Sequence, residues 1–188
     1  LEGTIDLAVH SAKDMPMELL DGLDVAAVLP RTDAEDVFVT VKGRDISNHP
    51  MVIGTGSLRR QLQIVEQKDA VCKLIRGNVD TRIRKMQEEE MDGIVLAAAG
   101  INRLGREQEI TCYLEPDQMI PAPAQGTLAL EVKADNIQLI RKLNRLSDQE
   151  TDLCVKAERR VLKQIGGSCH LPVGAYCKIQ DEKLVLRA

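Results

Sequence analysis

The sequence predicts an α/β protein with two lobes and a small additional α+β unit. Short apolar runs alternate with amphipathic helical patterns along most of the 188 residues, and such alternation favours a parallel sheet with helices on its faces. Two proline-containing connectors, Leu29–Thr32 and Ile120–Gly126, interrupt this pattern. Both connectors are expected to be crossings between lobes, and the two prolines of Ile120–Gly126 fix φ and bar helix, so this second connector is expected to be extended. The segment of about 31–121 would then be one lobe inserted into another.

The individual elements follow from local apolar patterns. Strands are predicted at Ile5–His10, Leu23–Leu29, Asp36–Val41, Met51–Gly54, Ala70–Ile75, Gly93–Ala98 and Thr127–Val132. Helices are predicted at Ser57–Gln67, Asn78–Glu89, Asn136–Leu146 and Asp148–Ile165.

The last of these helices has the clearest end signals. Ser147 and Glu150 have the spacing of a capping box, and Gly166 with Gly167 would end the helix. The expected apolar face consists of residues four apart: Leu153, Ala157, Val161 and Ile165. After it, Val173–Ile179 and Lys183–Leu186 flank Gln180-Asp-Glu and predict a hairpin.

Composition excludes several functions. The formal net charge is −4, so a general attraction to nucleic acid or to an anionic membrane is not expected. Aromatic residues make up only 2%, which removes the stacking platforms of single-strand binders. No apolar run is long enough for a membrane span, and no signal peptide opens the chain. The five cysteines include no C-x-x-C pair, so a reduced, cytoplasmic setting is expected.

Cations follow four of the predicted strands. In open α/β sheets, ligands bind outside the carboxyl ends of the strands. The polar and basic residues at these ends are Ser11, Lys13, Asp14, Thr55, Ser57, Arg59, Arg60, Arg76, Arg82 and Arg103. Any one arginine could be a solvated surface residue, but four such ends in an acidic protein predict a site for a polyanion. Carboxylate and phosphate ligands are both compatible with guanidinium groups.

Asp14 and Cys169 stand out chemically. Asp14 could cap a turn or pair with Lys13, or it could face a cationic intermediate. Cys169 follows Gly-Gly-Ser on a turn that argues against deep burial, whereas Cys72 and Cys154, and less firmly Cys112 and Cys177, are expected to be buried. Cys169, His170 and Cys177 lack a fourth ligand and a usual zinc spacing, so no metal site is predicted. His10 is expected to be a hydrogen-bonded structural residue.

Six segments in order resemble the hydroxymethylbilane synthase (porphobilinogen deaminase) family. They are DLAVHSAKDMP (6–16), IGTGSLRRQLQ (53–63), LIRGNVDTRIRKM (74–86), LAAAGINRLG (96–105), PAPAQGTLALE (121–131) and AERRVLKQIGGSCHLPVGAY (157–176). The resemblance covers nearly the whole chain, with one departure: Ser168 fills an extra place between the glycines and the cysteine.

The resemblance implies a transferase of porphyrin and haem biosynthesis. Family members join four porphobilinogen molecules head to tail, release ammonia each time and give the linear tetrapyrrole hydroxymethylbilane. The matching cysteine, Cys169, would carry a dipyrromethane cofactor through a thioether, and Asp14 would be the catalytic aspartate. The carboxylates of substrate and cofactor would be bound by Ser11, Lys13, Thr55, Ser57, Arg59, Arg60, Arg76, Arg82 and Arg103.

The resemblance also implies a domain layout. Two lobes would resemble periplasmic binding proteins with doubly wound mixed sheets: domain 1 from residues 1–30 and 122–146, and domain 2 from 31–121. A cofactor-bearing third domain would span 147–188. Since Leu1 is not an initiator methionine, we expect a piece of a longer chain that lacks parts of domains 1 and 3. We expect a monomer; a non-enzymatic two-lobed receptor for a small anion is the alternative function.

Overall fold

The computed structural model describes residues 4–41, 50–67, 69–166 and 171–188. The chain divides into two compact units. Unit 1 comprises residues 1–34, 122–169 and 173–188, and unit 2 comprises 35–121 with 170–172. The chain therefore passes from one unit to the other after Ala34 and again after Pro121, close to the two proline-containing connectors.

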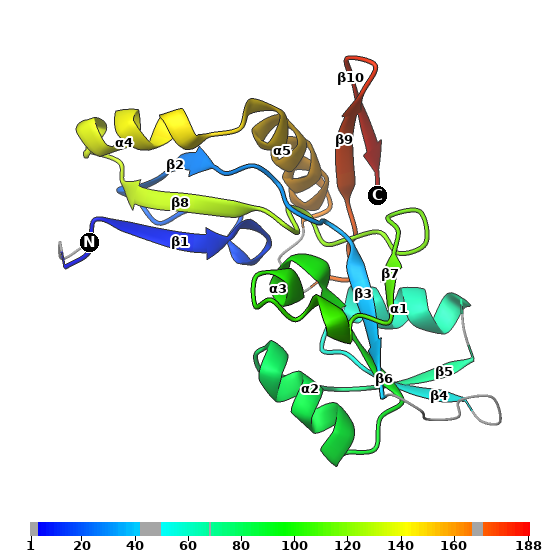
Figure 1. Cartoon of the computed structure of the whole chain (residues 1–188). Coiled ribbons are helices and arrows are strands. Elements are labelled where there is room, and N and C mark those ends of the chain that lie inside the picture. The colour runs from blue at the N-terminus through cyan, green and yellow to red at the C-terminus, as the bar shows by residue number, and fades with distance from the viewer. Residues whose placement is uncertain (1–3, 42–49, 68, 167–170) are drawn as a thin grey trace. The chain divides into compact units, whose positions relative to one another are not determined.

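Unit 1 contains a sheet in which β8 (Leu128–Lys133) lies between β1 (Leu7–Ser11) and β2 (Leu23–Val28), antiparallel to both (Figure 1). A 3₁₀ turn, η1 (Ala12–Asp14), follows β1 directly. The turn residues Ala12 and Met15 pack with Val28 and Val155 in the core of this unit.

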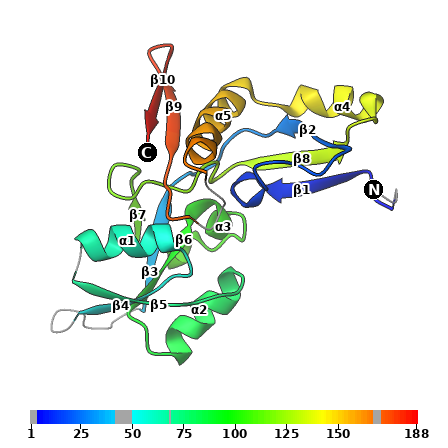
Figure 2. The same ribbon diagram turned by 180° about the vertical axis from the view of Figure 1, so that it is seen from behind.

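Helix and hairpin elements complete unit 1. They are α4 (Ile137–Leu143), the 3₁₀ helix η3 (Asn144–Leu146), α5 (Gln149–Gln164), β9 (Tyr176–Gln180) and β10 (Lys183–Arg187). The predicted hairpin is present: β9 and β10 are antiparallel and lie beside α5 in both views (Figure 1 and Figure 2). Asp181 and Glu182 take positive φ at its tip, as a two-residue hairpin turn requires.

Two details of α5 differ from the sequence prediction. The helix is capped by Asp148, whose carboxylate accepts a hydrogen bond from Thr151 N at 2.8 Å, while Ser147 Oγ accepts one from Val28 N instead. The predicted apolar face is also wrong, because Leu153 and Ile165 are exposed. The buried face consists of Thr151, Cys154, Val155, Glu158 and Leu162. Gly166 does end the helix at φ +67°.

Unit 2 is a mixed α/β layer structure. Its strands are β3 (Asp36–Thr40), β4 (Met51–Gly54), β5 (Ala70–Lys73), β6 (Gly93–Ala97) and β7 (Cys112–Leu114), in the order β5-β4-β6-β3-β7 within the described residues. Strands β5, β4 and β6 are parallel, as the strand–helix alternation predicts, whereas β3 runs antiparallel to β6 and to β7. The sheet is therefore mixed, as the family resemblance implies.

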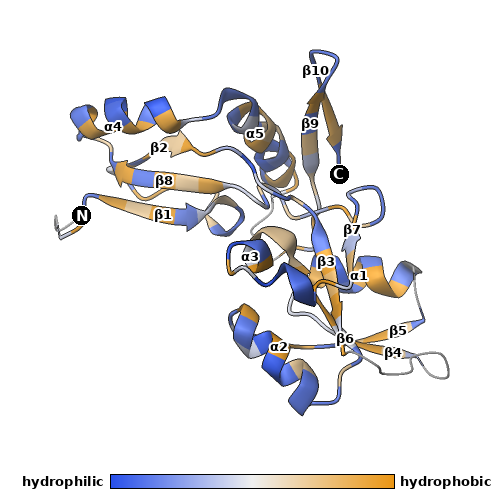
Figure 3. Ribbon diagram, in the orientation of Figure 1, coloured by the Kyte–Doolittle hydropathy of each residue, from blue (hydrophilic) through white to orange (hydrophobic). Residues whose placement is uncertain are grey.

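Helices cover both faces of this sheet. They are α1 (Leu58–Gln67), α2 (Val79–Glu88) and α3 (Ala98–Asn102), with a 3₁₀ turn, η2, at Glu107–Glu109. Alternate residues of β3 pack on opposite faces of the sheet: Val37 and Val39 pack with Ile83 of α2, while Phe38 packs with Ile64 of α1. Hydrophobic residues accordingly gather on the strands and hydrophilic ones on α2 and α4 (Figure 3).

The burial of two cysteines differs from the prediction. Cys154 and Cys177 are buried, but Cys72 is only half-buried and Cys112 is exposed on β7. Free cysteines are usually buried, which is why burial was expected, but Cys112 lies on β7, a three-residue strand at one end of the strand order. Within the described ranges, no helix combines the length and apolar character needed to cross a bilayer.

Candidate functional site

The carboxyl ends of three neighbouring strands converge at one edge of unit 2. Strands β5, β4 and β6 are parallel, so the residues that follow them share this edge. Because β3 is antiparallel to β6, with Asp36 opposite Ala97, the first residue of β3 lies at the same edge. The fold thus brings an acid, which the sequence analysis did not select, to the expected ligand edge.

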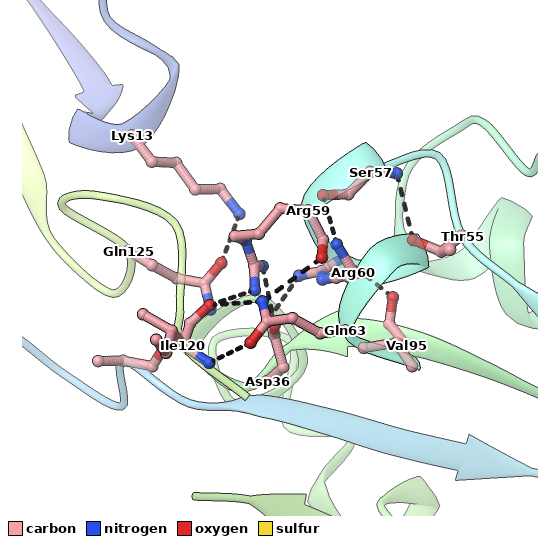
Figure 4. Close-up of polar contacts among 11 residues, drawn as sticks. Lys13, Asp36, Thr55, Ser57, Arg59, Arg60, Gln63, Val95, Ile120 and Gln125 are labelled. Carbon is pink, nitrogen blue, oxygen red and sulfur yellow. Dashed lines mark hydrogen bonds and ion pairs between the residues drawn. The ribbon is translucent and has the colours of Figure 1, made fainter. Parts of the chain in front are cut away.

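Asp36 is completely buried and bonds to two arginines of α1 (Figure 4). Arg59 donates to one carboxylate oxygen at 2.8 Å and Arg60 donates to the other at 2.7 Å. Arg59 also donates to Ile120 O at 2.6 Å, and Arg60 to Val95 O at 3.0 Å. Burial lowers the pKa of Arg59, while the Asp36 carboxylate acts in the opposite direction.

These contacts give Arg59 and Arg60 a structural role within unit 2. Both side chains are about 5% exposed, so most of their surface faces protein. One carboxylate and two guanidinium groups leave one positive charge in excess at the strand edge. Binding of a ligand carboxylate by either arginine stays a prediction.

Two residues with hydroxyl groups lie in the turn between β4 and α1. Thr55 is buried, and its hydroxyl oxygen accepts from Ser57 N at 3.2 Å. Ser57 is half-buried, and its own oxygen accepts from Arg60 N at 3.5 Å at the start of α1. A Cβ on Gly56 would lie 2.8 Å from Ile75 O, so only glycine allows this turn to approach the backbone that follows β5.

The remaining predicted cations of unit 2 are more accessible. Arg76 follows β5 and is exposed, and Arg103 is exposed at the end of α3. Arg82 on α2 is half-buried and donates to Gly77 O at 2.7 Å. These three arginines are therefore more exposed than Arg59 and Arg60.

Unit 1 carries the other predicted residues on and next to η1. Ser11 and Lys13 are half-buried and Asp14 is exposed. Lys13 Nζ donates to Gln125 Oε1 at 3.4 Å, and Gln125, itself 2% exposed, donates to Ala34 O at 2.7 Å. The lysine is thereby connected to the crossing segment of its own unit. His10, as predicted, is a hydrogen-bonded residue, 3.1 Å from a Glu131 oxygen.

Cys169 and His170 lie outside the described residues. Among the residues that are described, no group of three or more His, Cys, Asp or Glu side chains could hold a metal ion. Cys177 is buried against α5, where its thiol and that of Cys154 are hydrogen-bonded to each other.

The fold and these side chains define an α/β protein whose basic residues line the carboxyl edge of a mixed sheet. Family models match both parts of the chain: "Porphobilinogen deaminase, dipyromethane cofactor binding domain" over residues 1–141, and "Porphobilinogen deaminase, C-terminal domain" over 152–188. The chain belongs to the porphobilinogen deaminase family.

Curated relatives agree with this assignment. The porphobilinogen deaminase of Lachnospira eligens is 51% identical over 186 residues, which are 96% of this chain and 63% of the relative. That of Clostridioides difficile is 46% identical, over 99% of this chain and 63% of the relative. The chain thus spans less than two thirds of the length of these relatives.

Solved structures share only a distant likeness. A TRAP periplasmic solute binding protein from Desulfovibrio salexigens is 10% identical with a TM-score of 0.44, covering 87% of this chain and 60% of that one. An ancestral arginine-binding protein is 16% identical with a TM-score of 0.41, covering 87% and 68%. Both TM-scores lie below 0.5.

Proposed function

We propose that the protein is a hydroxymethylbilane synthase, a transferase that joins four porphobilinogen molecules head to tail with release of ammonia. Family membership, with 51% identity to a curated porphobilinogen deaminase over nearly the whole chain, carries this proposal. The accessible arginines support it, because each pyrrole of the substrate bears an acetate and a propionate. Fork-shaped guanidinium donors suit such carboxylates.

The proposal includes a dipyrromethane cofactor joined by a thioether to Cys169. The cofactor suits the charge of the described residues, since a chain of carboxylate-bearing pyrroles complements the excess positive charge near Asp36. When bound, it supplies the pyrrole to which the first substrate unit is joined. The side chains proposed to hold its carboxylates and those of the substrate are Ser11, Lys13, Thr55, Ser57, Arg59, Arg60, Arg76, Arg82 and Arg103.

These residues would act in different ways. Arg76, Arg82 and Arg103 would donate directly to carboxylates, because their side chains are the more accessible ones. Arg59 and Arg60 would contribute positive charge while they hold Asp36.

Asp14 is proposed as the catalytic residue. Loss of ammonia leaves positive charge on the substrate pyrrole, and an ionised carboxylate near the ring nitrogen stabilises that charge where it develops. The same carboxylate can also accept or return a proton at that nitrogen. Asp14 is exposed on η1, so it can contact a ligand.

We propose that the protein has three domains. Domain 1 would comprise residues 1–30 and 122–146, domain 2 residues 31–121, and the cofactor-bearing domain 3 residues 147–188. We propose a cytoplasmic monomer whose partner is the small-molecule substrate, and neither a nucleic acid nor a membrane.

A turnover assay tests the activity. The protein, produced from its complete gene, is incubated with porphobilinogen, and ammonia and tetrapyrrole are both measured. One ammonia per porphobilinogen consumed is expected. Binding of porphobilinogen without release of ammonia would contradict the enzyme and favour an anion receptor.

Mass spectrometry tests the anchor separately. After denaturation with reductant, a thioether survives whereas a disulfide or a non-covalent ligand is lost. The intact mass should therefore exceed the sequence mass by two pyrrole units, and Cys169→Ser should remove this increment and the activity together. Cys112→Ser is the matched control, because Cys112 is an exposed thiol whose loss disturbs no core. An increment that maps to another cysteine would overturn the anchor.

A further inference from the structure

The turn that carries Asp14 has little support of its own. The 3₁₀ helix η1 is three residues long, and Ser11 at its start provides no side-chain cap. Its hydrogen bond from Met15 N to Ala12 O is long, at 3.4 Å. Short 3₁₀ turns have poor hydrogen-bond geometry, so their conformation depends on neighbouring elements.

One arginine of α5 donates hydrogen bonds to three carbonyl groups in and next to this turn. Arg159 Nη1 donates to Ala12 O at 3.2 Å and to Met15 O at 3.3 Å, and its Nη2 donates to Pro16 O. These acceptors precede and follow Asp14 along the chain. Since the guanidinium group is planar and holds its donors in a fixed arrangement, it fixes the positions of the three carbonyls relative to one another.

Apolar and backbone contacts complete the attachment. Ala12 is 3% exposed and packs in the same core cluster as Val155 of α5, and Ala12 N donates to Thr127 O at 3.0 Å. The backbone on either side of Asp14 is thereby held, while the Asp14 carboxylate itself stays exposed. A carboxylate presented in this way can be preorganised without being buried.

We propose that Arg159 is a positioning residue for Asp14: by binding the carbonyls of Ala12, Met15 and Pro16 it fixes the backbone from which the catalytic carboxylate projects. The inference rests on the proposed function for Asp14, but the hydrogen bonds that carry it do not. Arg159 acts through the turn and does not itself bind the substrate. A small displacement of a catalytic group is enough to lower the rate of the chemical step.

The test compares Arg159→Ala with Arg159→Lys and with Arg160→Ala in protein from the complete gene. Arg160 is the next residue of α5, carries the same charge and is exposed, so its replacement controls for the loss of a cation from the helix. Arg159→Ala should lower kcat by about 10- to 100-fold. KM should change little, because a group that acts in the transition state mainly affects kcat. Arg159→Lys should recover part of the rate, and Arg160→Ala should retain all of it.

Hydrogen exchange separates positioning from general damage. In Arg159→Ala, amide exchange of residues 12–16 should accelerate relative to Arg160→Ala, while the thermal midpoint and the exchange of β8 stay close to the parent. An unchanged kcat, or a loss of rate accompanied by uniformly faster exchange throughout unit 1, would overturn the proposal. If the parent itself does not turn over porphobilinogen, the proposed function fails. The exchange comparison still decides whether Arg159 holds the turn.

Discussion

Arg31 and Glu158 are joined by two parallel hydrogen bonds of 2.8 Å each, although 127 residues separate them in the sequence. Glu158 is 1% exposed and also accepts from Ala124 N at 2.7 Å and from Cys177 N at 2.6 Å. One carboxylate therefore joins both crossing segments of unit 1 to α5 and to β9. Burial alone would lower the pKa of Arg31, but the hydrogen bond and charge of Glu158 raise it on balance.

Glu158→Gln should destabilise unit 1 strongly. The amide keeps the size of the side chain but leaves the Arg31 guanidinium without its counter-charge, and breaking a buried pair costs about 3–5 kcal/mol. Urea unfolding measures the loss. Glu150→Gln on the exposed side of the same helix is the control and should cost at most about 1 kcal/mol, the size of a helix-dipole contribution. Equal losses for the two variants would contradict the central role of Glu158.

Asp36→Asn should destabilise unit 2 by a similar mechanism. The replacement leaves Arg59 and Arg60 buried without their shared carboxylate, so a loss of about 3–5 kcal/mol is expected. Denaturant unfolding of Asp69→Asn, which removes an exposed acid from the same unit, provides the comparison. A loss of less than about 1 kcal/mol for Asp36→Asn would indicate that the arginines find other partners.

Asp14 is expected to act through its charge. Asp14→Asn keeps the shape and removes the anion, so kcat for porphobilinogen should fall at least about 100-fold, the scale for a preorganised electrostatic group. Asp14→Glu should retain part of the activity. The two variants are compared in steady-state assays at equal content of covalent cofactor; equal rates would favour a role in capping the turn.

The cysteines should differ in reactivity. Burial, followed by the neighbouring Cys154, raises the pKa of the Cys177 thiol to about 12, and burial also raises the pKa of Cys154. The thiolate is the reactive form, so both should resist a thiol reagent at pH 8 until the protein unfolds. Cys112 is exposed and should react in the native state. Peptide mapping after brief alkylation identifies the labelled residues; early labelling of Cys177 would contradict the packing of β9 against α5.

The same thiol links stability to alkaline pH. The pKa of Cys177 is higher in the folded protein, about 12, than the ordinary value of 9.0. Its contribution to stability is therefore complete below pH 9 and is lost as the pH rises toward 12, at no more than about 1.4 kcal/mol per pH unit. The free energy of unfolding should fall more steeply above pH 9 in the parent than in Cys177→Ala. Parallel curves would refute the assignment.

Local signals explain which parts of the fold could be predicted from the sequence. Met51–Gly54 and the helix after it carry their own apolar periods, and the structure has both. Asn78 lies at the predicted start of α2 and caps it by accepting from Thr81 N. The resemblance, which depends on ordered motifs rather than on contacts, is borne out by the family models.

Features that depend on distant partners could not be predicted in this way. An acid in the middle of α5 would ordinarily face solvent, but Glu158 is buried because Arg31 supplies its counter-charge. The buried face of the helix therefore includes Glu158, whereas Leu153 and Ile165 are exposed. Asp36 was passed over for the same reason, since nothing near it in the sequence shows that Arg59 and Arg60 will enclose it.

The pairing of β8 with both β1 and β2 has a consequence for synthesis on the ribosome. The two early strands leave the exit tunnel more than 90 residues before their common partner at Leu128–Lys133. Unit 2, in contrast, is nearly continuous in the sequence, so it can fold before β8 of unit 1 has been synthesised. During that interval the unpaired backbone edges of β1 and β2 are open to pairing with other nascent chains.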